Sequence, residues 1–404
     1  MPKLRFPGFE GEWDEKSLSE LATGFDYGMG AAACNFDGIN RYIRITDIDD
    51  VSHLYNCYNP VSPSGALEKK YIVNENDILF ARTGASTGKT YLYRKSDGLL
   101  YFAGFLIRAN IKSDNNSYFV FSLTLTAKYN NWVRLTSMRS GQPGINSQEY
   151  ASYRAFVPAL EEQNKIASFL TLLDERISKQ RELVESLKSY KRGVLSDIFS
   201  RKIRFMKKTN KAYPEWQIVK LSDLFSKISS RNTDNTISNV ITNSAEFGLL
   251  PQTDFFDKEI ANSENTSGYF VIEKYDFVYN PRKSNSAPYG PFNCYNYDET
   301  GIISPLYTAL RLKTKCNVEY LSWYFKSSSW YRYIYDNGSQ GVRHDRVSMT
   351  DELLFGIPIF IPCDEEQTKI TQYLSALNEY VGSEKNCLEA MVKIKDRLLN
   401  EMFI

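Results

Sequence analysis

The chain has few of the residues with which enzymes and metalloproteins build their sites. Its 404 residues include only two histidines, His53 and His344, and these fall in different halves. The six cysteines are scattered without a Cys-x-x-Cys pair, a usage typical of small core side chains in a reducing compartment. No His-based triad or zinc site can be assembled within one domain, so we expect a non-catalytic chain that holds no metal.

Long apolar runs and a strong net charge are also missing. No stretch of 18 apolar residues is present, and residues 1–5 (MPKLR) do not resemble a signal peptide, so we expect a soluble, cytoplasmic protein. The net charge of +1 alone gives no support to a nucleic-acid partner. The one dense basic run, residues 201–211, is typical of a solvated linker, although a phosphate-facing strap is an alternative.

What the chain does contain is an internal repeat. Residues 161–166 (EEQNKI) recur as residues 365–370 (EEQTKI), and a proline stands three positions before each Glu-Glu pair. Trp13 and Trp216 open the two halves, each followed by leucines at the same spacing. Two halves with matched ends predict an internal pseudo-twofold.

A helical pattern with a period of 3.5 residues follows each copy of the repeated element. Its apolar positions are alternately four and three residues apart, which predicts a coiled-coil seam; two unrelated surface helices are the alternative. The first-turn Glu pairs complement the helix dipole, and we expect Asp364 as an N-cap with Gln367 at the capping-box position. The predicted seam and partner-docking residues are Ile166, Leu170, Leu173, Ile177, Val184, Leu187, Ile370, Leu374, Leu377, Leu388, Met391 and Leu398.

The linker predicts the relative direction of the two helices. A helix over residues 161–199 would be about 58 Å long, whereas the linker 200–212 reaches at most about 45 Å. The second half must therefore begin near the end of the first helix, and its own helix must run back antiparallel. We expect an α+β fold: two mixed α/β domains related by a pseudo-twofold and held apart by two long antiparallel coiled-coil helices.

The two halves share further landmarks. Strand patterns at 77–82 and 101–107 correspond to those at 276–280 and 301–310, and each half then has a short helix and a Gly-rich turn. Residues 84–90 (GASTGKT) resemble a phosphate-binding loop, but only three residues separate the glycines and a strand pattern follows, so we expect a tight hairpin. Residues 280–283 (NPRK) lack the second proline and the aromatic residue of an amino-methyltransferase motif.

These features together resemble the DNA specificity subunit of type I restriction–modification enzymes. The resemblance rests on the Trp13-x4-Leu18 opening, the closing segment 158–166 (PALEEQNKI), the heptad helix and the repetition of the whole. Residues 77–84 (DILFARTG) and the turn at 140–142 are similar to the frame of that family. The second half departs from it where NPRK replaces ARTG, which leaves the geometry of that loop open.

The resemblance implies a division of labour along the chain. Target recognition domains at 1–158 and 213–362 would each read one half of a bipartite, asymmetric DNA sequence. Spacer helices at 159–200 and 363–404, with a basic linker at 201–212, would fix the separation of the half-sites. The implied partners are double-stranded DNA, two adenine-N6 methyltransferase subunits that carry S-adenosylmethionine, and two motor-endonuclease subunits that use ATP and Mg²⁺. The resemblance implies no cofactor on this chain.

Base readout requires hydrogen-bonding side chains on the loops that do not repeat. A solvated or structural role is open for each candidate, and a two-headed scaffold or the specificity part of another multisubunit DNA methyltransferase are alternative functions. The predicted DNA-binding residues are Arg82, Lys89, Arg134, Arg139, Gln142, Arg231, Arg282, Lys283, Arg343, His344 and Arg346.

Overall fold

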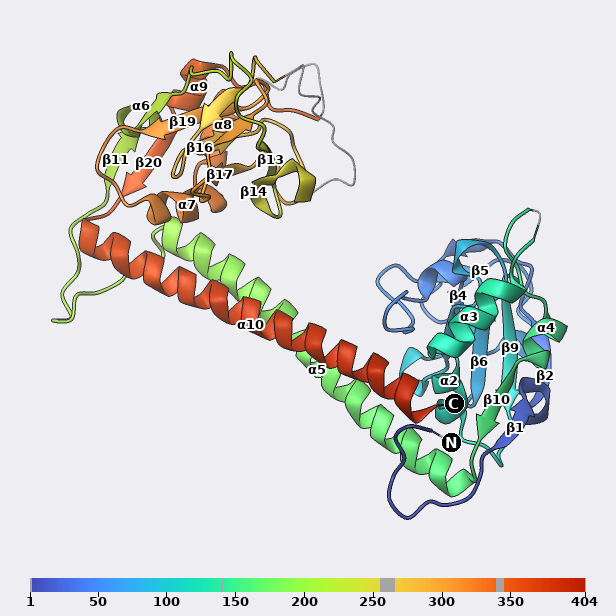
Figure 1. Cartoon of the computed structure of the whole chain (residues 1–404). Helices are drawn as coiled ribbons and strands as arrows, with labels where there is room; N and C mark the ends of the chain where they lie inside the picture. The colour runs from blue at the N-terminus through green and yellow to red at the C-terminus, as the bar shows by residue number, and fades with distance from the viewer. Residues whose placement is uncertain (1, 140, 255–265, 339–344, 404) are drawn as a thin grey trace. The chain divides into compact units, whose positions relative to one another are not determined.

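The computed structural model describes residues 2–139, 141–254, 266–338 and 345–403 (Figure 1). The chain divides into two compact units, Met1–Glu182 with Lys385–Ile404, and Leu183–Glu384. Each unit contains one globular domain and part of two long helices, α5 (Leu160–Phe199) and α10 (Asp364–Met402). Every described helix is too short or too polar to span a membrane. The predicted boundaries at 158, 200, 212 and 362 concern function and stay a prediction.

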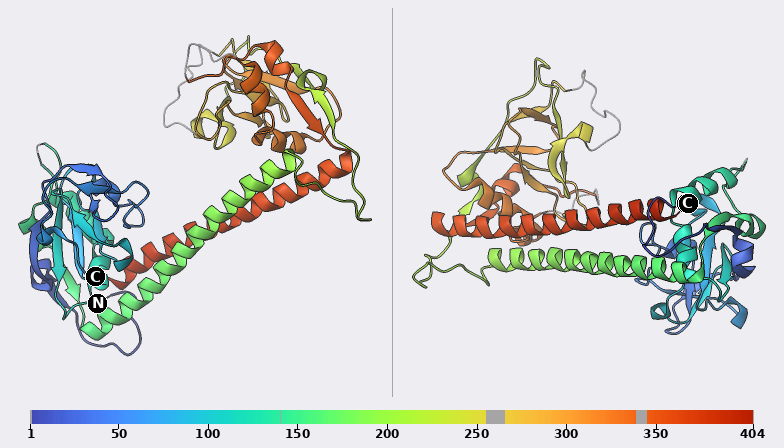
Figure 2. Two further views of the ribbon diagram at one scale, coloured as in Figure 1. Left: turned by 180° about the vertical axis from the view of Figure 1, so that it is seen from behind. Right: turned by 60° about the horizontal axis from the view of Figure 1, so that its bottom comes forward.

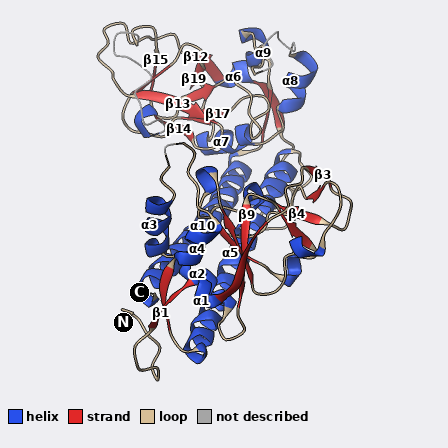
Figure 3. Cartoon of the chain, turned by 90° about the vertical axis from the view of Figure 1, so that its right-hand side faces the viewer, coloured by secondary structure: helices blue, strands red, loops and turns tan. Residues whose placement is uncertain are grey.

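The domain of the first unit is built on a four-stranded antiparallel sheet (Figure 3). All five residues of its strand β6 are buried, because successive side chains pack on opposite faces. Ile78 and Phe80 pack with the helices, whereas Leu79 and Ala81 pack with the outer strands. The sheet order is β2 (Ala22–Tyr27), β9 (Leu106–Ile111), β6 (Asp77–Ala81), β7 (Thr90–Leu92). The smaller pairs are β1 (Asp14–Ser17) with β10 (Arg154–Val157), β3 (Ala33–Asn35) with β5 (Val61–Pro63), and β4 (Arg41–Ile43) with β8 (Leu100–Phe102); the helices are α1 (Leu18–Leu21), α2 (Ser117–Leu123), α3 (Ala127–Thr136) and α4 (Ser147–Ser152).

The domain of the second unit repeats this sheet. Its order is β12 (Phe225–Lys227), β19 (Thr308–Leu312), β16 (Phe277–Tyr279), β17 (Phe292–Cys294), so β16 takes the place of β6. The parallel pair of β13 (Val240–Ser244) with β18 (Gly301–Ile303) corresponds to that of β4 with β8. A further sheet has the order β14 (Gly248–Pro251), β13 (Val240–Ser244), β18 (Gly301–Ile303), β15 (Phe270–Ile272); β11 (Gln217–Lys220) pairs with β20 (Pro358–Ile361), and the helices are α6 (Leu221–Leu224), α7 (Val318–Lys326), α8 (Tyr331–Asn337) and α9 (Asp351–Phe355).

The two long helices run antiparallel, as predicted, and lie side by side in both views of Figure 2. In the first unit the beginning of α5 meets the end of α10, where Lys395 Nζ lies 2.5 Å from Asp174 Oδ1. In the second unit the end of α5 meets the beginning of α10, where Lys191 Nζ donates to Asn378 Oδ1 at 2.9 Å. The twelve predicted seam residues are all buried or half-buried. The expected α+β fold with antiparallel coiled-coil helices is confirmed.

The repeated Glu-Glu-Gln element is a buried joint between each domain and its helix. We call joint 1 the contacts of Glu162 and Gln163, and joint 2 those of Glu366 and Gln367. All four side chains are buried. Gln163 Nε2 donates to Pro158 O at 2.9 Å, and its Oε1 accepts the Asn116 N–H at 2.9 Å. The element therefore fixes the strand end, the long helix and the beginning of α2 at one point.

Joint 2 repeats these bonds. Gln367 Nε2 donates to Pro362 O at 2.9 Å and its Oε1 accepts the Asn317 N–H at 3.3 Å. The expected capping box was wrong, because Asp364 is the first helical residue and Gln367 bonds outside the helix. The backbone N–H groups of Glu366 and Gln367 instead donate to the carbonyl of Cys363.

The buried glutamates of the two joints are matched by arginines that precede each domain. Arg5 Nε and Nη2 each donate to Glu162 at 2.8 Å. Arg204 donates to Glu366 at 3.3 and 3.0 Å, and Trp216 Nε1 adds a third bond to this carboxylate at 3.0 Å. Trp13 occupies the place of Trp216 in the first half, but its Nε1 has no hydrogen-bond partner among the described residues.

This difference predicts unequal effects of the same substitution. Trp216→Phe should lower the free energy of unfolding by about 1.5–3 kcal/mol, because a buried carboxylate loses a donor. Trp13→Phe should change it by less than about 0.5 kcal/mol, because it removes a donor that makes no bond. Urea denaturation of the full chain, followed by circular dichroism, measures both. Equal losses in the two variants would show that the bond to Glu366 contributes nothing beyond packing.

Candidate nucleic-acid interface

Two loops of the first unit pair at the end of β6. Thr83 forms a β-bridge with Gly144, Gly84 N donates to Pro143 O at 3.0 Å, and Ile145 N donates to Arg82 O at 2.9 Å. A 3-10 turn, η3 (Gly84–Ser86), leads from this pairing back into strand β7. The hairpin expected over residues 84–90 is thus confirmed, and a helix that could bind phosphate does not follow it.

The pairing brings two of the predicted DNA-binding residues together. Gln142 is exposed, and its amide nitrogen would lie 3.1 Å from a Cβ placed on Gly84. The Arg82 guanidinium stacks 4.8 Å from the centre of the Tyr27 ring, and its Nη1 lies 3.5 Å from Gly104 O. An arginine held in this way loses little side-chain entropy when it binds a further acceptor.

Arg134 and Arg139 lie on the segment that leads into the second of these loops. Both are exposed: Arg134 lies in the last turn of α3, and Arg139 lies two residues beyond the C-cap of that helix, Ser137. Arg134 Nη2 donates to Asn131 at 2.9 Å, and Arg139 pairs with Glu149. Both guanidinium groups remain exposed, so solvent and phosphate can reach them.

Lys89 differs from these arginines. Its side chain is 10% exposed, and Nζ donates to Ile48 O at 2.9 Å and lies 2.5 Å from Asp50 Oδ1. This geometry favours the structural role that the sequence leaves open for Lys89, because contact with DNA would require these bonds to break.

The second unit has an equivalent pair of loops at the end of β16. Lys283 N donates to Asp345 O and Val347 N donates to Pro281 O, both at 2.8 Å, and Arg282 forms a bridge with Arg346. Arg282 is exposed, whereas Lys283 and Arg346 are half-buried. The structure therefore gathers three predicted DNA-binding residues, Arg282, Lys283 and Arg346, on one loop pair.

Three other predicted residues are not in this group. Arg343 and His344 lie outside the described residues. Arg231 lies at a different strand edge, where its guanidinium is 4.9 Å from the centre of the Phe270 ring and its Nη1 donates to Gly268 O at 2.9 Å.

The first residue of the NPRK segment, Asn280, stabilises the loop. Asn280 is buried, its Nδ2 donates to Asn243 O at 3.2 Å, and its Oδ1 accepts the Arg282 N–H at 3.0 Å. Gly290 closes the same loop with φ +85°, and a Cβ there would lie 2.0 Å from Asn280 O. The asparagine therefore shapes the loop and does not present an amide to a flipped base.

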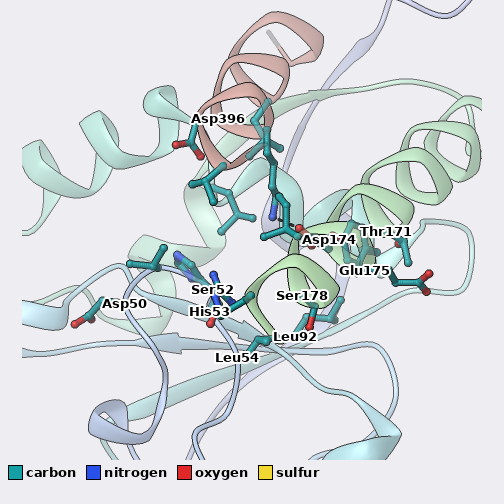
Figure 4. Close-up of a pocket in the computed structure, with 18 of the residues that line it drawn as sticks. Asp50, Ser52, His53, Leu54, Leu92, Thr171, Asp174, Glu175, Ser178 and Asp396 are labelled. Atoms are coloured by element: carbon teal, nitrogen blue, oxygen red, sulfur yellow. Dashed lines mark hydrogen bonds and ion pairs between the residues drawn. The ribbon is translucent and has the colours of Figure 1, made fainter. Parts of the chain in front are cut away.

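A hollow of about 900 Å³ lies between the first domain and the long helices of the same unit (Figure 4). His53 lines it, and burial lowers the pKa of this imidazole while its Nδ1 lies 2.8 Å from Thr90 O. Asp174 in the same wall already binds Lys395 and the Tyr118 hydroxyl, and burial raises the pKa of Tyr118. No group of three potential metal ligands occurs among the described residues. The contacts of Asp174 therefore join the first domain to both long helices of the same unit.

Sequence reasoning overlooked exposed apolar residues beside the paired loops. Phe105 and Leu306, read as interior residues of the strand patterns 101–107 and 301–310, stand on turns between two strands and are each 60% exposed. Alternation alone could not reveal these turns, because the flanking residues keep the strand pattern.

Comparisons with known proteins agree with this architecture. Residues 11–187 match the family described as type I restriction modification DNA specificity domain. The specificity subunit of the MjaVIII type I restriction enzyme of Methanocaldococcus jannaschii is 28% identical over 161 residues, which cover 39% of this chain and 37% of that protein. A second subunit of that organism, assigned to the MjaX enzyme, is 24% identical over 82% of this chain and 78% of its own length.

Solved structures show the same fold over nearly the whole chain. A chain from a study of complex assembly and conformational transition of the type I R-M system has a TM-score of 0.61 at 16% identity, with 96% of this chain and 97% of that chain covered. The S subunit from M. genitalium has a TM-score of 0.52 at 14% identity, with coverage of 100% and 99%. The HsdS subunit from Thermoanaerobacter tengcongensis has a TM-score of 0.50 at 19% identity, with coverage of 99% and 98%.

The geometry at Lys89 generates a prediction of its own. Lys89→Met should lower the free energy of unfolding by about 1–3 kcal/mol, because two carbonyl groups and Asp50 lose their donor. Arg134→Met, at an exposed site, should stay within about 0.5 kcal/mol. Thermal and urea denaturation of the two variants compare them directly. If Lys89→Met were as stable as the wild type but bound DNA more weakly, Lys89 would be a DNA contact after all.

Proposed function

We propose that the chain is a DNA specificity subunit of a type I restriction–modification enzyme, and that its two globular domains each read one half of a bipartite, asymmetric DNA target. The observation that carries this proposal is the equivalent pair of loops in the two units. Each pair follows the central strand of its sheet, and each gathers cationic or amide side chains. Side chains of this kind are the donors that read base edges and contact phosphates.

The reading surfaces differ between the domains. In the first domain we assign the loops with Arg82 and Gln142, with Arg134 and Arg139 toward the phosphates. In the second domain we assign the loops with Arg282, Lys283 and Arg346. Different side chains on equivalent loops suit two unlike half-sites, which is what an asymmetric target requires.

The helix pair would set the number of unread base pairs between the half-sites. At 40 and 39 residues, α5 and α10 are each about 60 Å long, which exceeds the ~34 Å of one turn of DNA. The seam residues would hold this spacing by packing against each other. The outward face would serve partners: Tyr190 and Ile394 stand at equivalent heptad positions and are both exposed.

We further propose that the chain is the non-catalytic part of a larger complex. Two methyltransferase subunits would dock on the two equivalent faces and carry S-adenosylmethionine for adenine-N6 methylation. Two motor-endonuclease subunits, with ATP and Mg²⁺, would add restriction. The purified chain alone should therefore neither methylate nor cut DNA, and turnover by the pure chain would refute the assignment.

Genome-wide mapping of methylated adenines, in cells with and without this chain, tests the function as a whole. A bipartite, asymmetric motif should be methylated only when the chain is present. If no motif depended on the chain, a two-headed scaffold that does not read DNA would be the better explanation.

Arginine substitutions test the assignment of the loops. In the complex with the methyltransferase partner, Arg82→Ala should weaken binding by about 1–3 kcal/mol and relax the preference in the first half-site only. Arg282→Ala should do the same in the second half-site only. Fluorescence anisotropy with DNA randomised in one half-site at a time measures both. Arg397→Ala, at an exposed arginine paired with Glu401 on α10, is the control. Loss of preference in both half-sites from one substitution would contradict the division.

A further inference from the structure

Each domain carries a tight turn with an exposed apolar side chain at the same place in its fold. In the first domain the turn 103–106 joins β8 to β9, and in the second the turn 304–307 joins β18 to β19. The same bond closes both, from Leu106 N to Ala103 O at 2.8 Å and from Tyr307 N to Ser304 O at 3.0 Å. Phe105 and Leu306 occupy the third position, and each is 60% exposed.

Hydrogen bonds fix the backbone of the turn that carries the Phe105 ring. Gly104 N donates to Met29 O at 2.7 Å, and Arg82 N donates to Phe105 O at 3.0 Å. Arg82 Nη1 also approaches Gly104 O at 3.5 Å. These bonds fix the backbone of the turn, and in this conformation the Phe105 ring is 60% exposed.

Both turns lie beside the proposed reading loops. Arg82 itself joins the first turn to Tyr27 and to the loop 143–145. In the second domain β16 ends and β19 begins at the paired residues Tyr279 and Thr308, so the turn 304–307 and the segment that continues to Arg282 leave the sheet at the same edge. Each apolar side chain thus lies on a turn at the sheet edge from which a predicted base-reading arginine also extends.

A single exposed apolar residue is ordinary on a protein surface. Here the exposure recurs at the equivalent turn of two domains whose side chains otherwise diverge, and on the same edge as the cationic loops. Arginine and glutamine make their specific bidentate contacts in the major groove, where the one apolar feature of a base pair is the 5-methyl group of thymine. Phe105 and Leu306 share apolar character but not aromaticity, which suits contact with a methyl group better than stacking between bases.

We propose that Phe105 and Leu306 are specificity-determining residues, each of which contacts a thymine methyl group in the half-site read by its own domain. This inference rests on the proposed function and deepens it. The arginine and amide side chains of the paired loops would read hydrogen-bonding patterns, and the apolar side chain would add the preference for thymine that those donors cannot supply.

The test replaces thymine by uracil, which removes only the methyl group. The full chain in complex with its methyltransferase partner is titrated with its mapped target, one thymine replaced at a time. For the wild type, one replacement in each half-site should weaken binding about fourfold, the effect of one methyl group leaving an apolar contact. Phe105→Ala should weaken binding to the thymine target to a similar extent and should remove the uracil effect in the first half-site alone.

The second domain provides the matched control. Leu306→Ala should remove the uracil effect in the second half-site and leave the first unchanged, and Tyr58→Ala, at a 91% exposed aromatic on another loop, should change neither. Since Phe105 and Leu306 are exposed, both variants should keep the wild-type melting temperature, which circular dichroism checks.

The possible failures are distinguishable. A wild-type complex that binds no sequence selectively would overturn the proposed function and this inference with it. A selective complex with no uracil effect, or with the same uracil effect in Phe105→Ala and Leu306→Ala as in the wild type, would overturn the inference alone. So would 2-aminopurine fluorescence that rises in the wild-type complex but not in Phe105→Ala, since it would show that the ring enters the base stack.

Discussion

The buried Glu-Arg pairs of the two joints are the constraint on which the rest of the structure depends. A carboxylate buried without donors costs on the order of several kcal/mol, so Glu162 and Glu366 can occupy the core only where an arginine and the neighbouring backbone meet them. Gln163 and Gln367 then fix the adjacent strand end and helix start through both ends of their amides. Each long helix therefore leaves its domain in one defined orientation.

The parts of the fold that sequence could predict are those set by local pattern and chain length. The heptad spacing specified the seam, and the short linker required an antiparallel return. The structural role of Glu162, the second glutamate of the repeated element, could not be predicted, because its partner Arg5 lies 157 positions away in the sequence. Contacts with residues distant in sequence also give Lys89 and Arg82 different surroundings. Both are cations near one hairpin, but only Lys89 is bonded to Ile48 O and Asp50. Composition and spacing hold no information on such bonds.

The internal repeat places residues at equivalent positions in the two halves, but their side chains differ in charge and in hydrogen-bond partners. At equivalent sites on the helix pair, Asp174 faces Lys395 as a charged pair, whereas Asn378 faces Lys191 as a neutral acceptor. Burial lowers the pKa of Lys191, which has no carboxylate partner in that contact. Trp13 and Trp216 differ in the same way, since among the described residues Trp216 Nε1 has an acceptor and Trp13 Nε1 has none. The repeat is therefore kept in the backbone and the seam, whereas the hydrogen bonds and ion pairs at these equivalent positions differ between the two units.

This difference between equivalent positions fits the proposed function, in which one frame would serve two readings. The turns at 103–106 and 304–307 have the same closing bond and the same exposure at their third residue, yet one presents a phenyl ring and the other an isobutyl group. The loops beside them pair through backbone atoms, and the exposed side chains of Gln142 and Arg282 take no part in this pairing. Side chains at such places can differ without a cost in packing. A frame that holds its loops by backbone bonds leaves the surface they present free to differ, and an asymmetric target demands that freedom.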